Sequence, residues 1–171
     1  MLLTAIFTGL RASGLRGLRW ADIDLKCGEL HVRQRADRFN TIGRPKSESG
    51  ERTVPPAPML VNTLREWKLA CPKSDDLAFP NGRGNIDYLT NIVKLSPQPA
   101  QVAVGVVNAA GKAKYPGLHA LRHFYASWCI NRRVDGGLEL PLKLVQSRLG
   151  HSNVNSAATT ARSWLPLRRH T

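Results

Sequence analysis

The spacing of apolar residues along the 171-residue chain is mainly that of amphipathic helices. Segment 58–70 places Leu60, Leu64 and Trp67 near the 3.6-residue period of a helix. Segment 141–150 is bracketed by a proline at its first turn and a glycine just past its end, as helices often are. Helices are predicted over residues 1–10, 13–20, 58–70, 85–95, 118–133, 141–150 and 153–165.

One region changes to the two-residue period of a strand. Leu30 and Val32 alternate there with the polar His31 and Arg33, which predicts a half-buried strand. Turn-forming glycines and prolines follow, and residues 52–54 can return as a second strand. The pattern therefore predicts a β-hairpin region over residues 28–55 with a polar, basic tip. With the helices, this gives an α+β fold that is mainly helical and has a small antiparallel sheet.

Another segment, residues 96–117, is rich in Pro, Gly and Ala and is expected to be a mobile connection. No internal repeat or low-complexity tail is present. The apolar opening lacks the basic region and cleavage site of a signal peptide, and it is too short to span a bilayer. We therefore expect no membrane contact.

The net charge of the chain indicates the kind of partner that it binds. The chain has 25 Lys and Arg against 12 Asp and Glu, a formal net charge of +13, and 42% of its residues are hydrophobic. That apolar content is enough for a packed core, and the excess positive charge favours a nucleic acid as the partner. The three cysteines, Cys27, Cys71 and Cys129, have no metal-ligand spacing and suggest free thiols in a reducing cytoplasm.

The strongest candidate chemistry lies in residues 117–123, GLHALRH. His119 and Arg122 are three residues apart near a helix start, so they share a face and can approach one anion. An Arg can hold phosphate oxygens while a His moves a proton. Taken alone, the same pair is also typical of a solvated surface helix.

Three further blocks carry candidate residues, and each has an ordinary alternative. Arg11 stands in the turn between two helices, Lys46 at or near the hairpin tip, and His151 just after a helix-ending glycine. Exposed turns commonly carry such residues without a function. Arg16 and Arg19, on the helix after Arg11, are candidates to bind a DNA backbone or only water.

Together and in this order, the blocks are much more specific. The chain reads T-G-L-R-x-S, then L-R-W-x-D-I-D, a lysine-bearing hairpin ending in R-T-V-P, then H-x-L-R-H and L-G-H. This order resembles the tyrosine recombinase family, the phage integrases, from about Thr8 to about Pro166. The resemblance implies site-specific cutting and rejoining of double-stranded DNA without metal, ATP or any other cofactor.

The resemblance also implies roles. Arg11 and Arg122 would clamp the scissile phosphate, Lys46 would protonate the leaving oxygen, and His119 would act as acid–base partner of the nucleophile. His151 would hydrogen-bond the phosphate. The expected DNA-binding residues are Arg16, Arg19, Arg33, Arg35 and Arg44. A bacterial or phage-encoded protein acting in the cytoplasm is expected, with self-association on DNA left open.

The nucleophile itself is missing. Ten residues after the L-G-H histidine, where the family has its tyrosine, this chain has Ala161. Alcohols such as Thr159, Thr160 and Ser163 are weaker acids than a phenol, whose pKa is about 10. We therefore expect an inactive or remnant integrase domain that keeps its phosphate pocket. An active recombinase and an unrelated basic DNA-binding protein remain the alternatives.

The domain organisation follows from the same resemblance. Residues 1–171 are expected to form one integrase-type catalytic domain, with the His and Arg helices and the C-terminal segment in residues 118–166. Family members carry a core-binding domain before this one, so the chain is expected to be truncated at its N-terminal side.

Overall fold

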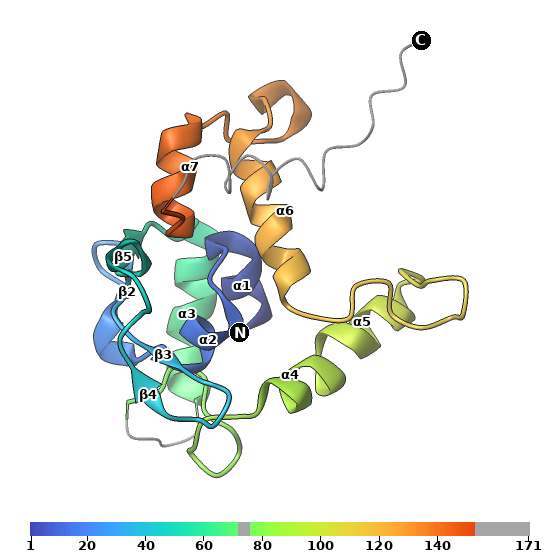
Figure 1. Cartoon of the computed structure of the whole chain (residues 1–171), viewed down its shortest axis with the longest axis horizontal. Helices are drawn as coiled ribbons and strands as arrows, with labels where there is room; N and C mark the ends of the chain where they lie inside the picture. The colour runs from blue at the N-terminus through green and yellow to red at the C-terminus, as the bar shows by residue number, and fades with distance from the viewer. Residues whose placement is uncertain (72–75, 153–171) are drawn as a thin grey trace.

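The part of the chain that the computed structural model describes, residues 1–71 and 76–152, contains seven α-helices, three short 3-10 helices and five short strands (Figure 1). The helices are α1 Leu2–Thr8, α2 Ala12–Arg16, α3 Pro58–Ala70, α4 Leu89–Leu95, α5 Pro97–Ala103, α6 His119–Ile130 and α7 Leu142–Leu149. The strands are β1 Ile23–Asp24, β2 Glu29–Val32, β3 Arg35–Ala36, β4 Ile42–Gly43 and β5 Arg52–Val54. This confirms the predicted mainly helical α+β fold.

The predicted pairing of two strands within residues 28–55 is present. β2 runs antiparallel to β5, with Leu30 opposite Val54 and Val32 opposite Arg52, and β1 pairs with the other edge of β2. Leu30 and Val32 are buried as the alternation predicts.

The connection between β2 and β5 is more elaborate than a single hairpin. β3 and β4 form a separate two-stranded ribbon, and its tip is the turn at residues 37–41. The turn forms there because the Asp37 side chain accepts the N–H groups of Phe39 and Thr41. Lys46 therefore lies on the returning segment beyond β4, near the ribbon but not in the turn at its tip.

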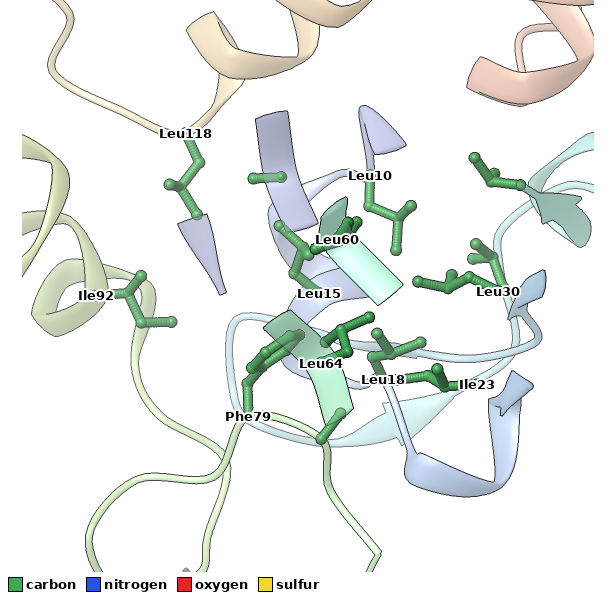
Figure 2. Close-up of a cluster of buried hydrophobic side chains, with 14 of the residues drawn as sticks. Leu10, Leu15, Leu18, Ile23, Leu30, Leu60, Leu64, Phe79, Ile92 and Leu118 are labelled. Atoms are coloured by element: carbon green, nitrogen blue, oxygen red, sulfur yellow. The ribbon is translucent and has the colours of Figure 1, made fainter. Parts of the chain in front are cut away.

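The main hydrophobic core lies where α1, α2 and α3 meet the three-stranded sheet. Figure 2 shows Leu15, Leu30 and Leu60 pointing toward one another from α2, β2 and α3, and all three are fully buried. A second cluster joins α6 to α7 through Tyr125, Cys129, Val145, Leu149 and Ala126. The Tyr125 side chain is only 1% exposed, so it is a core residue of this second cluster.

Gly9 has a positive φ and lies directly against the second cluster. Gly9 ends α1 with φ 61°, and a Cβ built on it would lie 2.4 Å from Cδ1 of Tyr125. Only glycine fits this position without strain and collision. The chain can thus turn sharply against α6 before reaching Leu10 and Arg11.

The helix predicted over 13–20 is shorter than expected. α2 ends at Arg16 because Gly17 packs directly on the backbone of the β3 strand, where a Cβ would lie 2.8 Å from the Ala36 nitrogen. The helix begins at Ala12, one residue before the predicted start, and Arg11 precedes its first turn. Helix α4 likewise starts at Leu89, since Ile86 is engaged in a β-bridge with Pro80.

Residues 96–117, expected as a mobile connection, contain regular structure. Pro97 starts α5, and Gln101 within it binds the returning chain: its side chain donates to the Tyr115 carbonyl and accepts from the Tyr115 N–H. This local tie explains why the segment is ordered around a helix despite its composition. Within residues 1–71 and 76–152, no helix combines the length and apolar character needed to cross a membrane.

Candidate anion-binding site

Basic side chains from four separate segments converge beside the α1–α2 turn. Arg11 comes from that turn, Arg52 from the start of β5, Arg122 from α6 and His151 from the residue after the α7 cap. Charge on each of the three arginines lowers the pKa of His151, and Arg11 and Arg52 both lower the pKa of Arg122. Arg122 therefore lies within electrostatic range of Arg11 and Arg52, and His151 within range of all three arginines.

Arg122 is a buried member of this cluster. Its side chain is 1% exposed and lies on the same stripe of α6 as the core residues Tyr125 and Cys129. Its Nη1 donates to the Gly9 carbonyl at 2.6 Å and its Nη2 to the Leu149 carbonyl at 2.5 Å, while its buried Nε has no partner among the described residues. Burial, followed by repulsion from Arg11 and Arg52, lowers the pKa of Arg122 to about 9.

The C-terminal end of α7 supplies the partial negative charge that holds two of these arginines. The last carbonyls of a helix have no intrahelical partner and form the negative end of its dipole. Here the Leu149 carbonyl accepts from Arg122, and the Arg148 carbonyl accepts from Nε of Arg52 at 2.6 Å. Main-chain carbonyls orient these guanidinium groups and leave their formal charge uncompensated.

The glycine of the L-G-H block makes this arrangement possible. Gly150 caps α7 with φ 62°, and a Cβ built on it would lie 2.4 Å from the Ser49 carbonyl oxygen and 2.9 Å from Nη1 of Arg52. A side chain at this position would push α7 away from the β5 segment. The motif glycine thus brings His151 and Arg52 together.

An open cavity of about 360 Å³ lies in front of the cluster. Its polar lining includes Arg11, Arg35, Lys46, Arg52, Ser13 and Gln34. The volume falls in the range of small-ligand sites, about 300–1,000 Å³. The sequence-derived Arg11 and Lys46 are therefore brought to one cavity, whereas Arg122 lies behind it, within the protein.

The two histidines complete the cluster at the α6 and α7 side. Burial, reinforced by Arg122, Arg11 and Arg52, lowers the pKa of His151 to about 4. Desolvation and the neighbouring His123 lower the pKa of His119. The His119 and His123 rings meet edge to face, with their centroids 4.7 Å apart. An anion placed among these groups would reverse the electrostatic part of these shifts and favour the protonated rings.

No carboxylate neutralises the three arginines within the part of the chain that the structure describes. The ion pairs recorded there join Arg19 and Arg33 to Asp22, His31 to Glu29, Arg44 to Glu51, and Arg132 to Asp135. Uncompensated, partly buried positive charge is costly unless an anion is bound. Chemically, the site can attract, orient and stabilise a phosphate group.

Arg16, expected to contact DNA, is inside the protein instead. Its side chain is 5% exposed, and it donates to the Asp87 carbonyl at 2.8 Å, the Asp37 carbonyl at 3.0 Å and Oδ1 of Asn40. The physical reason is that the β3–β4 ribbon and the start of α4 fold over α2 and offer these acceptors. Arg16 therefore joins the ribbon to the helices.

The other expected DNA-binding arginines lie closer to solvent. Arg19 and Arg33 share the buried carboxylate of Asp22, and Arg44 pairs with Glu51 at 2.9 Å while 84% exposed. Arg35 is half-buried, donates to the Arg44 carbonyl at 3.2 Å and lines the cavity. Of these four, Arg35 alone adjoins the candidate site directly.

Arg52 was not identified from the sequence, although a signal for it exists. Alternation along β5 places Arg52 on the same face as Val54, which is fully buried. A basic residue on the inner face of a strand indicates a specific internal partner.

Ala161, the expected nucleophile position, lies outside the described residues, as do Thr159, Thr160 and Ser163. Within residues 1–71 and 76–152, no group of three or more His, Cys, Asp or Glu side chains could hold a metal ion.

Comparison with known sequences and structures gives one consistent result. The Phage integrase family profile matches residues 1–162. A tyrosine recombinase XerC-like protein of Caldanaerobacter subterraneus subsp. tengcongensis is 31% identical over 92% of this chain, and a tyrosine recombinase XerC of Xylella fastidiosa (strain 9a5c) is 30% identical over 87%. The chain spans 43% and 42% of these two relatives, less than half of their length.

Solved structures agree on the fold. The Tn1549 transposon integrase (residues 82–397) in complex with circular intermediate DNA superposes with a TM-score of 0.72 at 21% identity, covering 93% of this chain and 53% of that one. A lambda integrase (residues 75–356) dimer bound to a core site gives a TM-score of 0.61 at 18% identity, covering 98% of this chain and 54% of that one.

Proposed function

The chain belongs to the phage integrase family, and we propose that it is the phosphate-binding part of a site-specific DNA recombination domain that binds duplex DNA but does not cleave it. One observation carries the proposal: Arg11 and Arg52 line one cavity, the buried Arg122 lies behind it, and no carboxylate pairs with these three arginines within the described residues. Such a site fits the non-bridging oxygens of a phosphodiester.

The proposed roles follow position and chemistry. Arg11 and Lys46 approach the phosphate from the open cavity, and in an Ala161→Tyr variant Lys46 would be the donor to the leaving oxygen. Arg122 contributes its charge from behind and fixes the Gly9 and Leu149 carbonyls at the rear of the site. His119 and His151 supply hydrogen bonds that strengthen when the phosphate is present. Phosphoryl transfer asks a protein mainly for such positioning and charge stabilisation.

The loss of cleavage is proposed from Ala161, because the methyl group of alanine cannot act as a nucleophile. The high net charge of +13 supports binding to the DNA backbone, and the names of the relatives and structural neighbours support DNA as the partner. A bacterial cytoplasm is the proposed location, since the relatives are bacterial proteins. Self-association on DNA stays a prediction.

Equilibrium binding of the chain to a 30-base-pair duplex, followed by fluorescence anisotropy between 50 and 200 mM NaCl, tests this function. Binding is expected to weaken steeply with salt, with a log–log slope of about −0.9 for each phosphate neutralised. Arg11→Gln is expected to reduce the slope by about one unit, because Arg11 faces the cavity.

The matched control is Arg133→Gln, which removes an exposed arginine from the turn after α6. Its slope should equal that of the wild-type chain. Equal slopes for Arg11→Gln and wild type, with both folded, would remove the candidate site from the DNA interface.

A further inference from the structure

The side chain of Arg52 occupies an unusual place for an arginine. It stands opposite Val32 in the β2–β5 ladder and shares a strand face with the fully buried Val54. An arginine on an inward face needs internal acceptors, because burying an unpaired charge is strongly unfavourable. The hydrogen bonds of the Arg52 guanidinium therefore show which of its nitrogens the protein uses and which is left for a ligand.

Only part of the Arg52 guanidinium is used by the protein. Nε donates to the Arg148 carbonyl at 2.6 Å, and Nη1 donates to the Gly50 carbonyl at 2.9 Å. Within the described residues no hydrogen bond engages Nη2, and Nη2 is not among the polar atoms sealed from solvent without a partner. One nitrogen is therefore held ready for a ligand while the other two fix the plane of the group.

The lining of the cavity shows which arginine lies beside Arg11 at the open surface. Its lining includes Arg11, Lys46 and Arg52 but not Arg122, which is 1% exposed and whose two Nη atoms both donate to main-chain carbonyls. The motif order alone pairs Arg11 with Arg122. The geometry instead places Arg52 beside Arg11 at the open surface.

On the basis of the proposed function, we propose that Arg52 is the phosphate-binding partner of Arg11 in this cavity and contacts a non-bridging oxygen through Nη2. Arg122 then acts as the buried charge behind this pair and holds the Gly9 and Leu149 carbonyls in place. The electrostatics agree, because burial and the charge of Arg11 lower the pKa of Arg52 to about 10. An anion between the two guanidinium groups relieves that repulsion.

The test uses the full chain and inorganic phosphate as the probe, at constant ionic strength and pH 7. Phosphate is titrated while the Nε–Hε signals of the arginine side chains are followed by NMR. The Arg52 and Arg11 signals are expected to shift with one common dissociation constant, and the signal of the exposed Arg133 is expected not to move.

Variants then separate binding from structural support. Arg52→Gln is expected to weaken phosphate binding at least tenfold, and Arg52→Lys three- to tenfold, because an ammonium keeps the charge but cannot bind the two carbonyls and an anion together. The control Arg133→Gln should stay within twofold of wild type. Circular dichroism melting identifies the folded variants that are compared.

The outcomes separate a failure of the inference about Arg52 from a failure of the proposed function. If Arg11 shifts with phosphate and Arg52 does not, or if folded Arg52→Gln binds phosphate within twofold of wild type, the inference about Arg52 is overturned and the proposed function stands. If phosphate shifts neither arginine and the wild-type chain does not bind duplex DNA, the proposed function fails, and the inference fails with it.

Discussion

Ala161→Tyr, in a fusion with the core-binding domain of a related recombinase, is expected to trap a covalent complex with a nicked duplex carrying that recombinase's site. The unchanged fusion, with Ala161 in place, is expected to give none. The reason is chemical: a phenol with a pKa of about 10 is both a usable nucleophile and a good leaving group, and the native position offers only a methyl group. Denaturing gel electrophoresis of labelled DNA measures the adduct.

Two companion variants make that experiment specific. Arg11→Gln in the Tyr background should reduce adduct formation about a hundredfold or more, since losing one transition-state charge partner typically costs about 3 kcal/mol. Arg133→Gln in the same background should leave it unchanged. A fused Tyr variant that binds the duplex tightly and forms no adduct would show that the cationic cluster does not support phosphoryl transfer.

Arg122→Ala is expected to lower the free energy of unfolding by about 3 kcal/mol, the largest stability effect we predict. The change leaves the Gly9 and Leu149 carbonyls without their donor and removes most of a side chain that is only 1% exposed, which opens a void. Each buried unsatisfied group costs about 1–3 kcal/mol. Relief of the repulsion from Arg11 and Arg52 offsets part of this loss.

Urea unfolding at pH 7, followed by circular dichroism, measures the change. Arg122→Lys should lose less than Arg122→Ala, because one ammonium can still reach one of the two carbonyls. Arg133→Ala, on the exposed turn after α6, should stay within about 0.5 kcal/mol of wild type, as surface substitutions do. A stability of Arg122→Ala equal to wild type would mean that Arg122 does not join α1 to α7.

Local patterns in the sequence predict most of the fold for identifiable reasons. The helix over 58–70 follows from the spacing of its apolar residues, and the one that ends at Gly150 follows from the proline and glycine that bracket it. Both are present. The β2–β5 pairing follows from the alternation of Leu30 and Val32. Gly17 escaped prediction as a helix end because its reason is a close contact with the β3 backbone, distant in sequence.

The site was predictable in its parts but not in its arrangement. Arg16 and Arg122 both stand in positions that a motif can identify, yet their acceptors lie far along the chain: the Asp87 carbonyl for Arg16 and the Gly9 carbonyl for Arg122. Periodicity does not reveal such partners. It could have indicated Arg122, which falls on the Tyr125 stripe, and Arg52, which falls on the Val54 face.

The central claim is that the cavity of Arg11, Lys46 and Arg52 binds a phosphate group. A crystal structure of the chain with tungstate, a phosphate-like anion with a strong anomalous signal, tests it most directly. The account predicts an anomalous peak in that cavity, within hydrogen-bonding distance of the Arg11 and Arg52 guanidinium groups. Tungstate bound elsewhere on the protein, with this cavity free of it at saturating concentration, would contradict the account.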